Sequence, residues 1–442
     1  MEELLREFES VPSNKKEVRD VFSAVDDAIS EAVEVRDQEF VDSPSLRKAL
    51  QIVEAFLRKT HRICYGGMAI NAHLPKSKKF YDFRKVLPDY DFFTPNPEED
   101  VKDLVRTFQE EGFDEVSARV GMHEGTTKIF VNFTGVADIT FMPQWMYTLL
   151  QKRAIQDDGI RYVDADFLRM NMYLELSRPR GEVERWDKVY KRLVLLNSLE
   201  NSENSKCGRK YSAKTTHVPQ DIHIHLIEYL AKHGLIYLGA ELKKVYETPK
   251  SFQHAHILRS TAPVMAIAEL PEIHVLSMKQ LLHSHDPSLK LQTVRWSALG
   301  ELVPEMYGLS LNGRVIFLVV QEKFCHAYNI VKLGKGKELK IAALDAAITM
   351  FYTLTFVRGL EGFVPKSLHC FANELVDISR KTRDVGKSGV FPLFPVTCQG
   401  HQPSKPTLLR EKVKRIAEMK KKSKTRKQLS KEKRGTTYKR SH

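Results

Sequence analysis

Three aspartates lie where two strand-like segments could bring their side chains together. Asp89 and Asp91 flank Tyr90 in the segment PDYDFF, and Asp138 lies in the later segment VADITFM. Because side chains alternate along a strand, Asp89 and Asp91 would share one face, about 7 Å apart. If the strand of Asp138 pairs beside the first strand, three carboxylates face one point and repel one another unless a cation neutralises them. The pattern therefore favours a site for Mg²⁺ or Mn²⁺.

A glycine pair, Gly66-Gly67, precedes the aspartates and adds a second element of the same chemistry. Without a Cβ, its backbone N–H groups could approach the phosphates of a nucleotide. Two divalent ions can activate an attacking hydroxyl and stabilise a leaving pyrophosphate in an in-line displacement. Each part alone has another interpretation. An Asp-x-Asp can be a pair of structural or solvent-exposed residues, and a glycine pair can be a simple turn. The order of the parts favours phosphoryl transfer.

The elements around these residues predict a small α+β domain. After Ser43-Pro44, residues 46–60 have the apolar spacing of a helix, which we expect to end before or at the glycine pair. Residues 98–113 predict a second helix, and residues 115–142 alternate as strands with glycine turns. The order helix, loop, strand, helix and strand pair indicates a small mixed sheet with helical flanks. Residues 164–199 read mostly as helix.

The length and composition indicate two globular portions and a basic tail. At roughly 150 residues per domain, 442 residues predict two or three domains. We expect an N-terminal helical segment, a catalytic domain, a second α+β domain and the tail, at residues 1–45, 46–200, 211–400 and 401–442. In the second domain, GRVIFLVVQ and CHAYNIVKL read as strands and ELKIAALDAAITMFYTLTFV as a helix. No apolar run approaches the ~20 residues of a membrane span, so we expect no membrane association.

The cysteines and histidines do not suggest a second chemistry. Five cysteines are scattered without a CxxC motif, which predicts reduced thiols in a reducing compartment (Cys64, Cys207, Cys325, Cys370 and Cys398). His217, His223 and His225 lie near one another in the sequence, but no further zinc ligands stand at a fitting distance. Buried or surface histidines are the simpler interpretation.

Basic residues gather in three places. Residues 405–442 carry 16 Lys and Arg against 3 Asp and Glu, whereas the first 404 residues carry 53 of each. Such a tail binds phosphate backbones by counterion release, although a targeting signal or simple solubility is the alternative. A basic-aromatic loop at 75–88 could touch RNA or be a solvated loop. From these two segments we predict RNA contacts by Lys78, Lys79, Arg84, Lys420, Lys421, Lys422, Arg426 and Lys427.

A third basic group lies on the predicted helix around residue 190. Arg185, Lys188 and Arg192 are three and four residues apart and would share a helix face. We predict that Lys188 and Arg192 contact the triphosphate of a nucleotide; an ordinary solvated helix surface is the alternative. Trp186, between Arg185 and Lys188, is predicted to be a core residue rather than a base-stacking platform.

Longer segments of the sequence resemble those of a known protein family. In order along the chain, six segments resemble the poly(A) polymerase catalytic subunits of nucleocytoplasmic large DNA viruses. They are YGGMAIN, KFYDF, PDYDFF, GMHEGTTKIFVNFTGVADIT, LRMNMYLELSRP and RWDKVYKRLVLLN. These belong to the polymerase β-like nucleotidyltransferase superfamily. The similarity is strong over residues 50–200 and loose beyond. Where many relatives have Gly-Ser, this chain has Gly66-Gly67, which leaves only backbone contacts to phosphate.

The resemblance implies a template-independent adenylyltransferase that adds AMP from ATP to RNA 3′ ends. Asp89, Asp91 and Asp138 would be the catalytic triad and hold two Mg²⁺ or Mn²⁺ ions, with Gly66 and Gly67 beside the phosphates. It also implies action in the virion and host cytoplasm, a degenerate second domain, and a homodimer or a separate processivity subunit. Another RNA nucleotidyltransferase, for example a uridylyltransferase, and a non-catalytic RNA-binding processivity protein are the alternatives.

Overall fold

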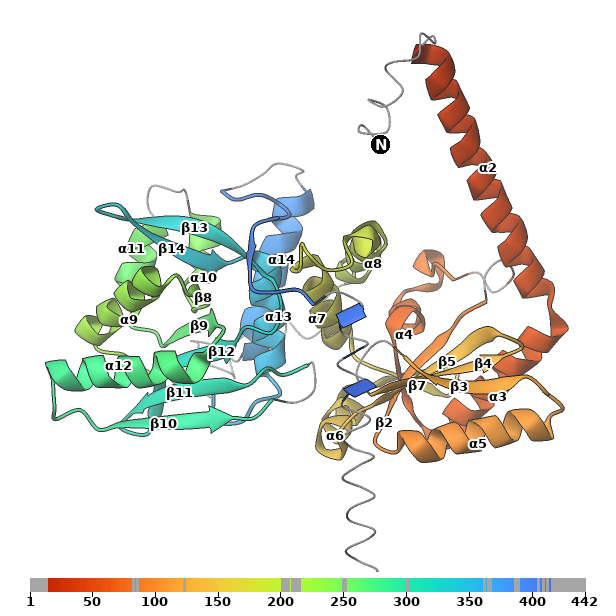
Figure 1. Cartoon of the computed structure of the whole chain (residues 1–442), viewed down its shortest axis with the longest axis horizontal. Helices are drawn as coiled ribbons and strands as arrows, with labels where there is room; N and C mark the ends of the chain where they lie inside the picture. Colours follow the sequence, from red (N-terminus) through yellow and green to blue (C-terminus); the bar gives the residue numbers. More distant parts are fainter. Residues whose placement is uncertain are drawn as a thin grey trace, which may run out of the picture. The chain divides into compact units, whose positions relative to one another are not determined.

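The computed structural model describes two compact units (Figure 1). The described residues are 15–81, 84, 87–121, 125–199, 207, 216–248, 253–298, 302–360, 363, 368–384, 390–403, 406–407, 410 and 413–414. The first unit takes in the described residues up to Val120 and those from Thr126 to Val163, and the second unit takes in Gly121, Gly125 and the described residues from Asp164 onward. The helices of residues 164–199 therefore pack with the later residues. The functional limits that the sequence suggests at residues 46, 200 and 211 stay predictions.

The first unit carries a seven-stranded mixed sheet with helices packed on it. Its elements are α2 (Lys15–Asp42), α3 (Pro44–Thr60), β1 (Ile63–Tyr65), α4 (Gly66–His73), η2 (Lys76–Lys78), β2 (Tyr90–Thr94), α5 (Pro97–Glu110), β3 (Val116–Val120), β4 (Thr126–Val131), β5 (Thr134–Phe141), α6 (Gln144–Arg153), β6 (Ile155–Asp157) and β7 (Ile160–Tyr162). The strand order is β3-β4-β5-β2-β1-β7-β6. The predicted α+β class is confirmed.

Local signals explain the helices that support this sheet. The Ser43 hydroxyl caps α3 by accepting from the Leu46 N–H at 3.3 Å, and Pro44 occupies the first helical position. Acidic residues fill the first turn of α5, where they complement the helix dipole. Both helices contact each other and β5, and their buried side chains belong to the core of the unit. That core includes Leu57, Ile63, Phe92, Leu104, Phe108 and Ile139.

The second unit carries an eight-stranded mixed sheet in the order β10-β11-β12-β9-β8-β14-β13-β15. Its elements are α7 (Ala165–Leu176), η3 (Val183–Arg185), α8 (Trp186–Asn197), α9 (Gln220–His233), β8 (Ile236–Tyr237), α10 (Leu242–Glu247), α11 (Gln253–Leu258), β9 (Val264–Ala268), α12 (Pro271–His285), β10 (Leu291–Trp296), β11 (Met306–Leu311), β12 (Arg314–Gln321), β13 (His326–Gly334), β14 (Lys337–Ala342), α13 (Leu344–Leu354), α14 (Leu368–Asp384) and β15 (Cys398–Gln399).

The two sheets repeat one pairing pattern. From β3 to β6 the neighbours pair antiparallel, antiparallel, parallel, antiparallel, parallel and antiparallel. From β10 to β13 the second sheet pairs in the same succession, and β15 adds a further edge. In this succession β8, β9 and β12 take the places of β1, β2 and β5. The second unit is thus a topological counterpart of the first.

Two sequence-based expectations are wrong. Residues 337–342 form strand β14 rather than the start of a helix, and α13 begins only at Leu344. Four of the five cysteines are paired, Cys207 with Cys370 and Cys325 with Cys398, so the prediction of reduced thiols fails for them. The partners are 163 and 73 residues apart, and no local spacing reveals such pairs. Cys64 is free and buried.

Within the described part of the chain, every helix is too short or too polar to span a bilayer.

Candidate active site

Two of the three aspartates are direct neighbours across a parallel strand pair. Asp91 on β2 lies in register with Asp138 on β5. Both side chains are half-buried, and Asp89 is exposed just before β2 begins. Because like-facing carboxylates on adjacent strands repel, this arrangement calls for a counter-charge. The predicted pairing of the two aspartate strands is therefore present.

The glycine pair lies directly against Asp91. Tyr65, the last residue of β1, is in register with Asp91, and the chain then turns into α4 at Gly66. Gly66 has a φ of 72°, and a Cβ added there would be 2.2 Å from Asp91 Oδ2. No side-chain hydrogen bond caps the N-terminus of α4 at Tyr65. The pair thus begins a helix beside a carboxylate, rather than merely ending one as the sequence suggested.

Tyr65 lies within the electrostatic field of all three carboxylates. Its ring stacks on Phe93 with centroids 4.1 Å apart, and its hydroxyl is 2.8 Å from Thr140 Oγ1. Burial raises the pKa of Tyr65 first, and the charges of Asp91, Asp138 and Asp89 raise it further. The phenol therefore stays neutral and serves as a rigid wall of the site. The charges of all three aspartates thus act on one tyrosine, although their ligand atoms do not form a group within 4.8 Å of one another.

Lys128 provides a counter-charge that the sequence analysis missed. It lies on β4 in register with Asp138, and its ammonium forms an ion pair with Asp138 Oδ2. The lysine is 42 % exposed and the aspartate 23 %, so solvent still reaches the pair. A signal was present, because Lys128 and Asp138 lie on the two alternating segments of one hairpin. Their opposite charges would satisfy a cross-strand pair.

The other predicted site residues have varied surroundings. Gly67 is buried in α4, Lys78 ends η2, and Arg84 is exposed. Lys79 forms an ion pair with Asp157 at 3.0 Å, a surface contact that explains its position without RNA. All of these belong to the first unit.

The remaining predicted contacts lie elsewhere in the chain. Lys188 is exposed and Arg192 half-buried on α8 of the second unit. Trp186 is half-buried rather than a core residue, and its indole N–H donates to the Glu175 carbonyl at 3.0 Å. Lys420, Lys421, Lys422, Arg426 and Lys427 lie outside the described residues.

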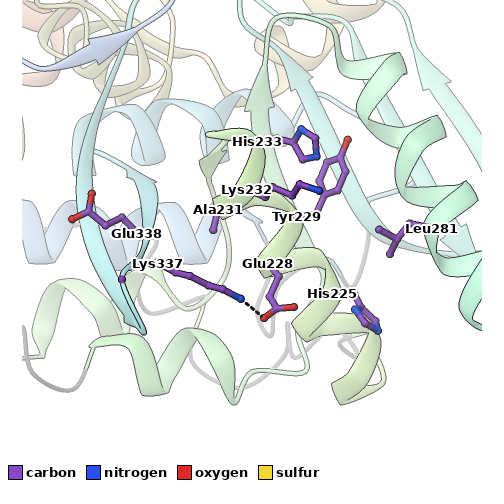
Figure 2. A pocket seen from close by; sticks show the side chains of 10 residues that line it. His225, Glu228, Tyr229, Ala231, Lys232, His233, Leu281, Lys337 and Glu338 are labelled. Carbon is purple, nitrogen blue, oxygen red and sulfur yellow. Dashed lines mark hydrogen bonds and ion pairs between the residues drawn. The ribbon is translucent and has the colours of Figure 1, made fainter.

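Among the described residues, His223 and His225 of the second unit belong to no group of three metal-binding side chains. Both ring nitrogens of buried His223 contact backbone carbonyls, of Ile257 at 2.9 Å and of Ala262 at 3.1 Å. Burial lowers the pKa of His223, although these contacts oppose the shift. His225 faces a hollow of about 650 Å³ beside α9, in which Lys337 and Glu228 pair at 2.8 Å (Figure 2). The hollow contains none of the three aspartates.

Comparison with known proteins identifies the segment that holds the carboxylates. Residues 51–182 match the family model described as "Poly(A) polymerase catalytic subunit". The match contains the glycine pair and all three aspartates. The predicted resemblance is confirmed.

Two viral relatives and one solved structure extend the comparison. A protein of Acanthamoeba polyphaga mimivirus that carries the same subunit name is 30 % identical over 155 residues, which cover 34 % of this chain and 26 % of that protein. Its counterpart in African swine fever virus, isolate Tick/Malawi/Lil 20-1/1983, is 27 % identical over 201 residues, covering 43 % and 41 %. The chain thus spans less than half the length of these curated relatives.

The crystal structure of the Megavirus polyadenylate synthase matches a larger part of this chain than the two sequence relatives do. It aligns with a TM-score of 0.70 at 18 % identity, over 91 % of this chain and 84 % of that one. The shared fold extends well beyond residues 51–182 and takes in most of both units. At this identity the similarity establishes architecture alone.

Proposed function

We propose that this chain is a template-independent polynucleotide adenylyltransferase, which adds AMP from ATP to RNA 3′ ends. The observation that carries the proposal is the register of Asp91 with Asp138 beside Gly66, inside the segment that matches the poly(A) polymerase catalytic subunits. The Megavirus polyadenylate synthase supplies an enzyme of the same architecture.

The carboxylates suit divalent cations, and we assign Asp89, Asp91 and Asp138 to hold two Mg²⁺ or Mn²⁺ ions. Hard oxygen donors on adjacent strands fit such ions, and the ammonium of Lys128 already offsets the charge of Asp138. When bound, the ions would increase the acidity of a hydroxyl and balance the charge of pyrophosphate. Asp138 would help take the proton from the RNA 3′-hydroxyl as that oxygen attacks the α-phosphate of ATP and pyrophosphate leaves.

The phosphates would lie at the start of α4. Backbone N–H groups of Gly66 and Gly67 stand at a helix N-terminus, where partial positive charge favours anions. Lys188 and Arg192 are proposed contacts of the triphosphate. Lys78, Lys79, Arg84 and the basic residues at 420–427 are proposed contacts of the RNA.

The setting follows from the relatives, which are proteins of large DNA viruses. We place the activity in the virion and the host cytoplasm. A homodimer or a separate processivity subunit is the corresponding proposal for assembly. Size measurement of the purified chain with and without RNA would separate these two.

Primer extension tests the function directly. Purified protein, a short labelled RNA, Mg²⁺ or Mn²⁺ and each ribonucleotide separately should give a ladder with ATP alone. Asp89→Ala/Asp91→Ala should abolish the ladder, and Asp103→Ala, an exposed aspartate on α5, should leave it unchanged. A ladder with UTP instead would point to a uridylyltransferase. RNA binding without any ladder would favour a binding protein.

A further inference from the structure

Two cysteines and a histidine converge in the second unit, whereas the carboxylates belong to the first. Ligand atoms of Cys207, His369 and Cys370 all lie within 4.8 Å of one another. His369 and Cys370 are consecutive in the first turn of α14, and Cys207 lies between α8 and α9. Among the described residues this is the one group of three such ligands. Thiolate and imidazole are the ligands that Zn²⁺ prefers in proteins.

A buried carboxylate orients the histidine. His369 Nε2 contacts Asp166 Oδ2, and the other oxygen of Asp166 accepts from Arg169 Nη1 at 2.7 Å. Asp166 is 7 % exposed and Arg169 is 2 % exposed, so this pair is fixed within the core of the unit. Metal-binding histidines use one ring nitrogen for the ion and engage a partner with the other. A carboxylate on the second nitrogen is the arrangement that orients metal-binding histidines.

The helix also favours the charged form of one sulfur. Cys370 is the third residue of α14, which has 17 residues, and it is 4 % exposed. The N-terminus of a helix stabilises a thiolate, which is the form that binds a metal. Helix, histidine and carboxylate therefore act on the same site.

We propose that Cys207, His369 and Cys370 form a redox-exchangeable Zn²⁺ site, of which the Cys207–Cys370 disulfide is the oxidised, metal-free state. Reduction opens it: a dithiol gives two electrons and two protons to the sulfur–sulfur bond, becomes a disulfide itself and leaves two thiols. Zn²⁺ then displaces those two protons and binds both sulfurs and His369. Water completes a four-coordinate ion. Either state fastens Cys207 to the start of α14.

The Cys325–Cys398 disulfide provides the matched comparison. It joins the residue before β13 to β15, and its sulfurs belong to no group of three metal-binding side chains among the described residues. Both disulfides lie in the same unit, so both respond to the same reductant. Loss of the second one should leave metal binding unchanged.

Cobalt titration of the reduced full-length protein tests the proposal. Co²⁺ should bind stoichiometrically with a sulfur-to-cobalt charge-transfer band, and Zn²⁺ should remove that band by displacement. Oxidised protein should show no band. Cys207→Ser/Cys370→Ser should abolish it, and Cys325→Ser/Cys398→Ser should retain it. His369→Ala should weaken binding by at least the roughly 10- to 100-fold that loss of an outer-shell partner costs.

Two results would overturn the site. Reduced wild-type protein that binds no cobalt would make the disulfide a plain cross-link. A band that persists in Cys207→Ser/Cys370→Ser would place the ion elsewhere. Circular dichroism of each variant confirms that the comparison is made on folded protein.

Discussion

At the scale of single residues, Gly66 combines two demands that a side chain cannot meet. Its φ of 72° is left-handed, and a Cβ would be 2.2 Å from Asp91 Oδ2. In Gly66→Ala the carboxylate must move, and a misplacement of about 1 Å can cost about 100-fold in rate. We therefore expect primer extension to fall by about 100-fold while RNA binding is retained.

Gly112→Ala is the control that distinguishes backbone strain from displacement of the Asp91 carboxylate. Gly112 has a φ of 87°, and a Cβ there would meet nothing within 4 Å. Gly112→Ala should share a backbone strain of about 1–2 kcal/mol but keep its activity. Equal losses of activity in the two variants would show that Asp91 is not the reason.

Lys128 is a second residue whose role can be measured. Its ammonium forms an ion pair with one oxygen of Asp138, a carboxylate that we propose to hold a cation. Lys128→Met removes this competing charge and keeps an unbranched apolar side chain. The Mg²⁺ concentration for half-maximal activity should therefore fall several-fold. Magnesium titrations of primer extension measure it. A higher requirement, or an increased KM for ATP alone, would instead assign Lys128 to the nucleotide.

At the scale of elements, local signals predicted well and long-range pairing did not. Ser43-Pro44 and the apolar spacing of residues 46–60 predicted α3, and alternation predicted β4 and β5. Residues 338–342 were mistaken for the start of a helix because one residue separates β14 from α13, so the alternation of the strand runs directly into the apolar spacing of the helix. The register of Asp91 with Asp138 spans 47 residues, and only the assembled sheet sets it.

One buried ion pair fixes α5 to β1 and gives a prediction about stability. Arg62 donates to both oxygens of Asp100 at 2.8 Å, and the aspartate is 3 % exposed. Burial alone would lower the pKa of Arg62, but the hydrogen bond and charge of Asp100 raise it. Asp100→Ala leaves the guanidinium of Arg62, whose side chain is 18 % exposed, without its carboxylate, so we expect the first unit to lose about 3 kcal/mol.

Asp103 on the same helix is the control for this pair. It is 54 % exposed and pairs with Arg106 at the surface, so Asp103→Ala should cost about 0–1 kcal/mol. Urea unfolding followed by Trp145 fluorescence reports the first unit, once Trp186 and Trp296 of the second are replaced by Phe. Similar midpoints for Asp100→Ala and Asp103→Ala would contradict the argument.

At the scale of the whole molecule, the two units share a topology but not a carboxylate set. Tyr237 is in register with Ala266, and Ala266 with Val319, at the places of Tyr65, Asp91 and Asp138. Ala266 and Val319 are fully buried, so apolar packing replaces the acids. Sequence alone suggested only a loose analogy between the halves, since the second half lacks the aspartate motif of the first. We infer that the second unit is a degenerate, supporting copy.

The basic tail is the last feature of the whole chain, and its contribution to RNA binding can be isolated. Residues 405–442 hold the entire net charge of +13. If they contact RNA phosphates, replacing Lys420, Lys421, Lys422, Arg426 and Lys427 with Gln should weaken binding about tenfold or more near 0.1 M salt and flatten its salt dependence. Extension at saturating RNA should persist, because the carboxylates are untouched. A parallel variant replaces the other proposed RNA contacts, Lys78, Lys79 and Arg84, with Gln, and binding titrations at several salt concentrations compare the contributions of the two sets. An unchanged salt slope in the tail variant would remove the tail from the RNA-binding surface.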